Sequence, residues 1–322
     1  RTLCSSGDTS NARVLMFKTK LPKLSVIYVK QGAYGDGTSW NNAFGRISQA
    51  VTEFRNQNSL YNNYPMIWVA GGTYTANYLY ITQKLRMYGG FNGNETQLTD
   101  ISQRNNPTIL DGNNTGYVLY SSSDLTEATA SLIDGFTITN APIGANIYGW
   151  VTLKNCTIEG CSHRGVEVRK NSGTRSLALQ NCRIVNNVSS YSTDAKGAGV
   201  YAKNVIIENC LIANNSALEG SGGGLYSLGN VTLRHCDIVG NNAQNYGGYY
   251  SATNDTLQGC IVWGNKSAAN GEPDYLRYDA AYQYNALYRT VVGNGNIVLA
   301  YSNAGEIGRA VQQECRDRYR MP

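Results

Sequence analysis

The sequence predicts an all-β solenoid: a single-stranded right-handed parallel β-helix with an N-terminal capping α-helix. Three observations predict it. A segment of alternating apolar and polar residues recurs about every two dozen residues, most copies carry a cysteine at one position, and glycine-rich stretches separate several copies. One coil of such a repeat cannot bury its own apolar face. Successive coils are therefore expected to stack and to place like residues above like.

The clearest repeat is a strand segment that contains a cysteine. In residues 151–158, apolar and polar residues alternate, which indicates a strand with one buried face. Four later segments match it, and residues 132–138 fit with Gly135 in the place of the cysteine. The cysteines follow one another at intervals of 24–28 residues. They are expected to form one interior column, mostly of free thiols, although stacked neighbours would also lie within disulfide range. The column comprises Cys156, Cys182, Cys210, Cys236 and Cys260.

A second column is expected five residues after the cysteine or Gly135. Asparagine recurs there, and only the coil with Cys161 departs from it. Stacked asparagine side chains can hydrogen-bond from coil to coil, and asparagine tolerates the left-handed backbone of a sharp corner. The predicted ladder comprises Asn140, Asn187, Asn215, Asn241 and Asn265. A glycine-rich return then precedes Tyr201, Tyr226 and Tyr250 in three of the coils.

The solenoid is expected to occupy residues 26–301, between an N-terminal extension of residues 1–25 and a C-terminal cap or tail of residues 302–322. An open solenoid end must be covered. Residues 39–55 have helical apolar spacing, with Ser39 as a candidate N-cap, and are predicted to be the capping helix. Cys4 and Cys315 lie outside the cysteine column and are the expected pair if a terminal disulfide exists.

Composition limits the classes of function. The net charge is +5 over 322 residues and no basic stripe is present, which argues against nucleic-acid binding. No apolar run is long enough for a membrane-spanning helix. Because the chain begins at Arg1 rather than methionine, it is expected to be a processed product or a fragment, and we expect it at the cell surface or outside the cell.

Several runs resemble the right-handed β-helix repeat surface proteins of Bacteroidota. They are residues 27–30, 35–44, 67–74, 88–96, 107–112, 133–138, 222–226 and 260–265. The runs also look like the repeats of chlamydial polymorphic outer-membrane proteins, and the shared fold is that of the pectate-lyase-like superfamily. The resemblance covers about residues 26–305. It implies an exported surface protein and specifies no activity.

Catalytic chemistry has few candidates in the sequence. The signatures of polygalacturonases and a clustered aspartate site for Ca²⁺ are both missing, and single cysteine rungs with two histidines offer no tetrahedral metal site. We therefore expect no metal and no cofactor. Asp111 and Asp134 occupy similar Asp-Gly contexts and are candidates for stacking, although an Asp-Gly turn explains both. Charged residues also crowd one coil, where they form either a cleft or a solvated edge: Glu159, His163, Arg164, Glu167, Arg169 and Lys170.

Tyrosines toward the C-terminal half are the preferred candidates for ligand contact. Tyrosine combines apolar area with a hydrogen-bonding tip, which suits sugars and protein partners; the alternative is that these rings only cover the helix. The candidates are Tyr246, Tyr249, Tyr250, Tyr275, Tyr278 and Tyr282. The leading hypothesis is a non-enzymatic adhesin that binds an extracellular glycan or a surface protein. The alternatives are a polysaccharide lyase or glycoside hydrolase, and a structural component of a larger surface assembly.

Overall fold

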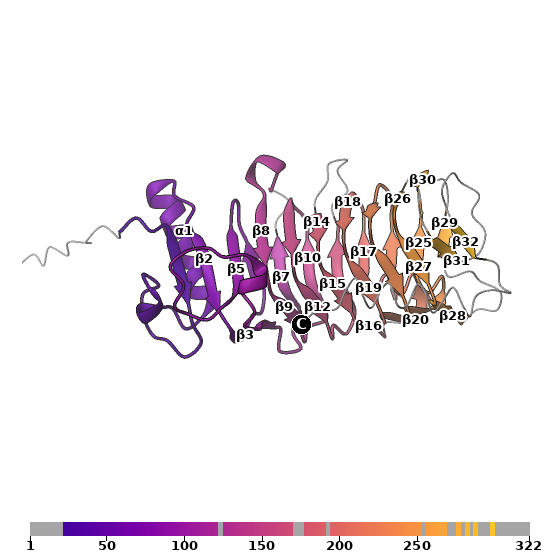
Figure 1. The fold of residues 1–322 in the computed structure, drawn as a ribbon. Helices are drawn as coiled ribbons and strands as arrows, with labels where there is room; N and C mark the ends of the chain where they lie inside the picture. Colours follow the sequence, from indigo (N-terminus) through magenta and orange to yellow (C-terminus); the bar gives the residue numbers. More distant parts are fainter. Residues whose placement is uncertain are drawn as a thin grey trace, which may run out of the picture.

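A computed structural model describes residues 22–121, 125–169, 177–190, 194–252 and 255–268, together with the backbone of four later strands. Within these residues the strands form three long parallel sheets and a short fourth sheet, and from β2 (Met66–Ala70) to β31 (Ala286–Tyr288) the chain visits the three long sheets in turn in successive coils. The coils stack along one axis, from the indigo end near α1 to the yellow end (Figure 1). This arrangement is a parallel β-helix, so the predicted fold class is confirmed.

Sheet A takes the first strand of each coil. Its strands, in order, are β1 (Val26–Val29), β2 (Met66–Ala70), β5 (Arg86–Phe91), β8 (Ser131–Asp134), β11 (Val151–Lys154), β14 (Leu177–Gln180), β18 (Val205–Glu208), β22 (Thr232–Arg234), β26 (Thr256–Gln258) and β30 (Ala281–Gln283).

Sheet B takes the second strand of each coil. Its strands are β3 (Gly72–Thr75), β6 (Thr108–Asp111), β9 (Thr137–Thr139), β12 (Thr157–Glu159), β15 (Arg183–Val185), β19 (Leu211–Ala213), β23 (Asp237–Val239), β27 (Ile261–Trp263), β31 (Ala286–Tyr288) and β32 (Ile297–Leu299).

Sheet C takes the third strand, and a short sheet D lies between sheets B and C along the chain in the later coils. Sheet C contains β4 (Leu79–Ile81), β7 (Tyr117–Ser121), β10 (Ile143–Ile147), β13 (Arg164–Val168), β17 (Val200–Ala202), β21 (Leu225–Ser227), β25 (Tyr249–Ser251) and β29 (Tyr275–Arg277). Sheet D contains β16 (Val188–Ser189), β20 (Ser216–Ser221), β24 (Asn242–Asn245) and β28 (Lys266–Ser267).

A single apolar core fills the space between the three long sheets. Alternation along each strand decides which side chains enter it: in β11, Val151 and Leu153 are fully buried while Thr152 and Lys154 face outward. The core cluster continues without a break from Ile27 to Val262. Each coil therefore depends on its neighbours for burial, as expected for a solenoid.

The capping helix begins later than predicted. Helix α1 is Ile47–Tyr61, and a 3₁₀ turn, η1 (Trp40–Asn42), occupies the predicted start. Ser39 is no N-cap of α1, because residues 43–45 continue alongside β1, where Phe44 bridges to Val29. Two further 3₁₀ turns are η2 (Ile101–Gln103) and η3 (Glu127–Thr129).

Helix α1 lies against β1 and β2 at the N-terminal end of the stack (Figure 1). Its buried side chains, Ile47, Ala50, Val51 and Phe54, join the apolar core. Residues 1–21 and 300–322, and with them Cys4 and Cys315, lie outside the described residues.

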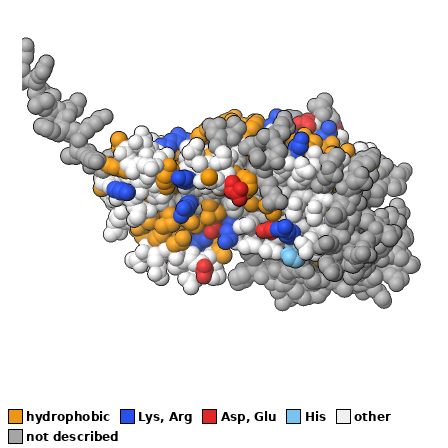
Figure 2. All heavy atoms as spheres, turned by 90° about the horizontal axis from the view of Figure 1, so that it is seen from above, with side chains coloured by type: hydrophobic (Ala, Val, Ile, Leu, Met, Phe, Trp, Pro, Cys, Tyr) orange, Lys and Arg blue, Asp and Glu red, His pale blue; other side chains and the backbone are white. Residues whose placement is uncertain are grey.

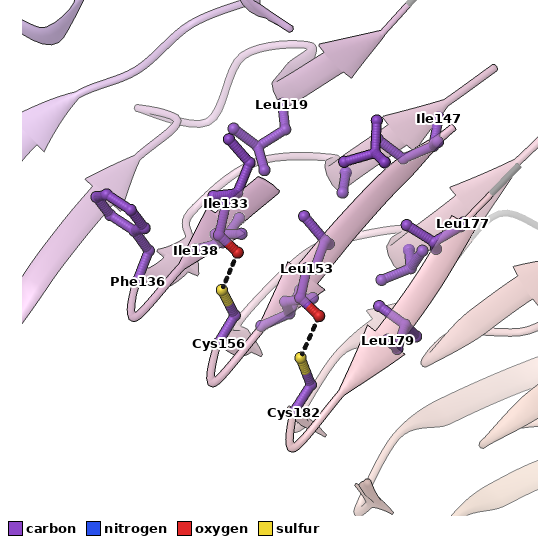
Figure 3. Packing of buried hydrophobic residues seen from close by; sticks show 14 of the residues in the cluster. Leu119, Ile133, Phe136, Ile138, Ile147, Leu153, Cys156, Leu177, Leu179 and Cys182 are labelled. Carbon is purple, nitrogen blue, oxygen red and sulfur yellow. Dashed lines mark hydrogen bonds between the residues drawn. The ribbon is translucent and has the colours of Figure 1, made fainter. Parts of the chain in front are cut away.

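The cysteines stack at the corner between sheets A and B. All five are buried free thiols, and Cys182 donates from its Sγ to the carbonyl of Leu153 in the preceding coil at 3.3 Å. Figure 3 shows Cys156 and Cys182 at successive corners, each with its sulfur directed to a carbonyl of the coil before. Burial raises the pKa of the Cys156 and Cys210 thiols, so both stay protonated and unreactive at neutral pH.

The first coil of this column corrects the predicted register by one residue. Thr137 pairs with Thr157, so Phe136 lies in the place of Cys156, as Figure 3 also shows. Gly135 instead has the positive φ of the corner residue, 82°, and it corresponds to Asn155, whose φ is 51°. A corner with left-handed backbone favours glycine or asparagine, so these two are equivalent and the interior position goes to the apolar ring.

The same one-residue shift removes Asn140 from the ladder. Asn140 has φ 58° at the next corner and corresponds to Gly160, while Ala141 is the residue in register with Cys161. Asn140 is half-buried and donates to Asp111 at 2.7 Å. It is therefore a corner residue, and the ladder prediction for it was wrong.

The remaining asparagines form a continuous interior ladder. Asn187 donates to the Oδ1 of Asn215 at 2.9 Å, and Asn215 donates to Asn241 at 3.0 Å. Asn241 donates to Asn265 at 2.9 Å. Each of these side chains also reaches a sheet B carbonyl of the preceding coil, as Asn215 does with Ile184 at 2.9 Å. Buried amides in this column are thus fully hydrogen-bonded.

Candidate functional site

The outward face of sheet C carries a column of tyrosines. Strand pairing sets Tyr80 beside Tyr120 at one end and Tyr201, Tyr226 and Tyr250 in succession at the other. In each strand the two neighbours of the tyrosine point into the core, as Val200 and Ala202 do on either side of Tyr201. The rings are half-buried, so their edges and hydroxyl groups remain accessible.

The rings pack face to face in the part of the column formed by Tyr201, Tyr226 and Tyr250. The centroids of Tyr201 and Tyr226 lie 5.5 Å apart and those of Tyr226 and Tyr250 lie 4.4 Å apart, with ring planes within about 20° of parallel. At the other end, Tyr120 lies 5.7 Å from Tyr80 and 5.8 Å from Tyr148. Burial, together with the neighbouring Tyr250, raises the pKa of Tyr226 to about 12. This hydroxyl therefore stays a neutral hydrogen-bonding group at physiological pH.

Two polar residues interrupt the column in its middle. Asn146 follows Tyr120 in register, and Glu167 follows Asn146 and precedes Tyr201. Both are buried, at 1% and 0% exposure. Among the described residues, neither amide atom of Asn146 and not the Oε2 of Glu167 has a hydrogen-bond partner. We call this pair the polar gap of the tyrosine column.

A buried ion cluster surrounds Glu167. Its Oε1 accepts hydrogen bonds from Arg164 at 2.8 Å and from Arg169 at 2.7 Å. Arg164 is 1% exposed and also binds the Asp194 carboxylate at 2.8 Å, while its guanidinium lies 4.4 Å from the ring centroid of Tyr201. A buried arginine is stable only when its N–H groups are paired, and these contacts supply the pairing.

His163 completes this cluster at the adjoining corner. Its Nδ1 lies 3.0 Å from the Ser189 hydroxyl, and its Nε2 lies 3.9 Å from Asp194. Burial, assisted by the positive charge of Arg164, lowers the pKa of His163 to about 4. The imidazole is therefore neutral at physiological pH and contributes hydrogen bonding rather than charge.

A cavity of about 260 Å³ opens beside Glu167, one of the two residues of the polar gap. Its wall includes Glu167, Arg169 and Tyr201, with Asp194, Lys203 and Leu228. The cavity thus combines hydrogen-bond donors, acceptors and one aromatic surface, which is the composition of a site for a polar ligand.

The structure divides the charged coil that the sequence singled out. His163, Arg164, Glu167 and Arg169 converge on sheet C, whereas Glu159 lies in β12 of sheet B and Lys170 lies outside the described residues. Because Arg164 and Glu167 are almost completely buried, the expectation of a solvated edge was wrong for them.

The six candidate tyrosines have different positions. Tyr250 belongs to the column, and Tyr246 is half-buried beside it, with ring centroids 5.6 Å apart. Tyr249 points inward with no exposed surface and its hydroxyl donates to Asp255, so its assignment to a ligand surface was wrong. Tyr275 pairs with Tyr249 and Tyr282 pairs with Leu257 in backbone register; their side chains, and all of Tyr278, lie outside the described residues.

Asp111 and Asp134 do not stack. Asp111 ends β6 in sheet B, whereas Asp134 ends β8 in sheet A and forms a buried ion pair with Arg104 at 2.9 Å. This pair borders a shallow groove of about 560 Å³ on sheet A, whose rim includes Tyr88, Lys154 and Asn155. The groove is a second concave surface, but its buried charges, Arg104 and Asp134, neutralise each other.

Charge elsewhere is dispersed. On the face in Figure 2, Lys and Arg side chains lie singly or beside acidic ones, and hydrophobic side chains gather toward the N-terminal half. Across the described residues, no group of three or more His, Cys, Asp or Glu side chains converges as metal ligands. No helix in the described part of the chain is long and apolar enough to cross a membrane.

Comparisons with known proteins give the family and the handedness of the coil. No curated protein sequence matches significantly. Among solved structures, the chain is similar to the pectate lyase Pel9A, with 14% identity, a TM-score of 0.56, and coverage of 85% of this chain and 73% of the lyase. A pectin methylesterase from Aspergillus niger aligns with 15% identity over 88% and 83% of the two chains, but its TM-score of 0.38 is too low for an argument.

The family match covers the coils that carry the site. The family model described as "Right handed beta helix region" matches residues 89–266, which is more than half of the chain and includes the polar gap and the ion cluster. This chain therefore belongs to the right-handed β-helix family.

Proposed function

We propose that this chain is a non-enzymatic glycan-binding module that acts at the cell surface or outside the cell. The observation that carries the proposal is the tyrosine column on sheet C, which repeats one outward aromatic position through successive coils. Tyrosine edges offer apolar contact and hydroxyl groups together, which suits the alternating C–H and O–H surface of a sugar.

The spacing of the column also supports a polymer as the ligand. Neighbouring parallel strands lie about 4.8 Å apart, so the hydroxyl groups form a row along the axis of the helix. A linear glycan lying parallel to this axis would meet a tyrosine edge on either side of the polar gap. The column is rigid because the inward neighbours of its rings are anchored in the core, so little conformational entropy is lost on binding.

Surface display is supported by the resemblance to exported β-helix repeat proteins of Bacteroidota. The likeness to a pectate lyase concerns the fold alone. At the polar gap, Arg164 and Arg169 both bond to the Oε1 of Glu167, so neither arginine is free to act as the base that a lyase needs. This engagement favours binding over catalysis.

A glycan array with purified protein tests the proposal. We expect binding by the wild type and at least tenfold weaker binding by Tyr226→Ala, because the central ring of the column is lost. Tyr34→Ala is the matched control, since Tyr34 is 99% exposed and lies outside sheet C. Equal loss in both variants, or no loss in Tyr226→Ala, would contradict a site on the column.

The same polysaccharides distinguish the alternatives. Ultraviolet absorbance of an unsaturated product would reveal a lyase, and new reducing ends would reveal a hydrolase; either result overturns the non-enzymatic assignment. If no glycan binds, the result would favour a structural role in a surface assembly.

A further inference from the structure

We propose that Asn146 and Glu167 select the ligand, and that they select a neutral sugar with two adjacent hydroxyl groups. This inference rests on the proposed function, and it names the class of glycan that the tyrosine column binds. It starts from the polar gap, where two consecutive coils place amide and carboxylate groups at a position that five other described coils give to tyrosine.

The hydrogen-bonding capacity of the gap is unused. Asn146 makes no side-chain hydrogen bond with the described residues, and the Oε2 of Glu167 has no partner there either. A buried polar atom without a partner destabilises a protein, and such atoms are rare in native structures. In the same molecule, every asparagine of the interior ladder is fully bonded. An incoming ligand is the partner that would satisfy the gap.

The chemistry of the gap specifies the ligand. A carboxamide presents one donor and one acceptor side by side. Two adjacent sugar hydroxyls match this pair, because one can donate to the Oδ1 while the other accepts from the Nδ2. The Oε2 of Glu167 can accept from a further hydroxyl. An acidic sugar fits less well, because Arg164 and Arg169 are already bonded to the Glu167 carboxylate, which a sugar carboxylate would have to displace.

We place the route of entry at Arg169, the partner of Glu167 whose side chain is partly exposed. Its side chain is 48% exposed and its Nε bonds to Glu167 at 2.7 Å beside the 260 Å³ cavity. When this side chain swings away, the Oε1 of Glu167 keeps its bond to Arg164, which is itself fixed by Asp194. The gap can therefore open without leaving Glu167 as an isolated charge.

Calorimetric titration with defined oligosaccharides tests this inference. The probes are cellohexaose, laminarihexaose and mannohexaose as neutral sugars, and hexagalacturonate as the acidic one. We expect the wild type to bind at least one neutral probe at least tenfold more tightly than hexagalacturonate. Asn146→Leu should weaken that binding at least tenfold while its melting temperature equals or exceeds that of the wild type. Glu167→Gln should weaken it as well, and the Asn146→Leu result stands if Glu167→Gln fails to fold.

Three outcomes would overturn the inference. The first is unchanged binding by Asn146→Leu while Tyr226→Ala still loses affinity; the proposed function then survives and the selecting role does not. The second is tighter binding of hexagalacturonate. The third is a lower melting temperature for Asn146→Leu, which would show that Asn146 has a structural partner. If the wild type binds no probe and no glycan on the array, the proposed function fails together with this inference.

Discussion

Asparagine is buried in two columns of this molecule, and its side-chain hydrogen bonding differs between them. At the corner after sheet B, Asn215 accepts from Asn187, donates to Asn241 and donates to the carbonyl of Ile184. On the outward face of sheet C, Asn146 is as deeply buried, at 1% exposure, and bonds to none of the described residues. Burial is the same, and hydrogen bonding is complete in one column and missing in the other.

This difference in hydrogen bonding indicates that the ladder asparagines serve the fold and that Asn146 has a role outside it. A satisfied ladder fixes the register of the coils, since each rung fits only the rung above and below it. An unsatisfied amide weakens the fold, so a role outside the fold explains its presence better than stability does. The following predictions test this contrast, from the largest expected effect to the smallest.

Removal of a ladder rung should have the largest effect on stability. Asn215→Ala leaves the Asn187 amide, the Ile184 carbonyl and the Asn241 Oδ1 each short of a bond. We expect the free energy of unfolding to fall by about 3–4 kcal/mol, because each unsatisfied buried group costs roughly 1–3 kcal/mol. Urea unfolding measures the loss. Asn214→Gly is the control: Asn214 is exposed with φ 55°, a conformation that glycine adopts freely. Equal losses in both variants would contradict the ladder.

The ion cluster beside the polar gap should make stability depend on pH. Unfolded histidine titrates near pH 6.5, whereas folded His163 has a pKa of about 4. Between these values the unfolded state binds more protons, so the free energy of unfolding should fall as pH drops from about 6.5 to about 4, by up to roughly 2–3 kcal/mol. Urea unfolding across this range, with His163→Gln as the comparison, measures the effect. Identical slopes for both proteins would refute the low pKa.

The tyrosine column should contribute modestly to stability. Tyr226→Ala removes a ring that stacks on Tyr201 and Tyr250, but the ring is half-buried. We expect the free energy of unfolding, measured by thermal unfolding, to fall by about 1–2 kcal/mol, because the stacking contacts and the partial burial of the ring are lost. A loss as large as that of Asn215→Ala would mean that the column is mainly structural.

An exposed asparagine row should matter least. Asn181 donates to Asn155 at 3.2 Å and accepts from Asn209 at 3.3 Å, yet it is exposed to solvent. Asn181→Gly keeps the favoured φ of 53°, and water replaces the lost amide. We therefore expect the free energy of unfolding to change by less than about 0.5 kcal/mol. A change above 1 kcal/mol would show that stacking, rather than burial, makes an asparagine ladder stabilising.

The repeat makes most of the fold predictable from sequence. Strand alternation and the spacing of the cysteines locate the coils, because each coil must bury its apolar face against its neighbours in the same way. The register failed only where the repeat lacks both markers: the first coil has Phe136 for cysteine and Ala141 for asparagine. Alignment on the apolar residue Ile138, which pairs with Ile158, would have given the correct register of this coil.

The site is only partly visible in the sequence. Tyr201, Tyr226 and Tyr250 each follow a glycine-rich return, and this regularity marks them as one column. The same alignment places Tyr249 at the position of Val200 and Leu225, which marks it as an inward, buried residue. The burial of Asn146 and Glu167 depends on side chains from neighbouring coils, so it emerges only from the packed structure.

The most direct test of the contrast is to make the same substitution in both columns and compare unfolding. We expect Asn215→Leu to lower the free energy of unfolding by about 3 kcal/mol or more, and Asn146→Leu to leave it unchanged or to raise it by about 1 kcal/mol. Opposite signs would establish that one buried asparagine serves the fold and the other does not. A similar loss in both variants would contradict the account.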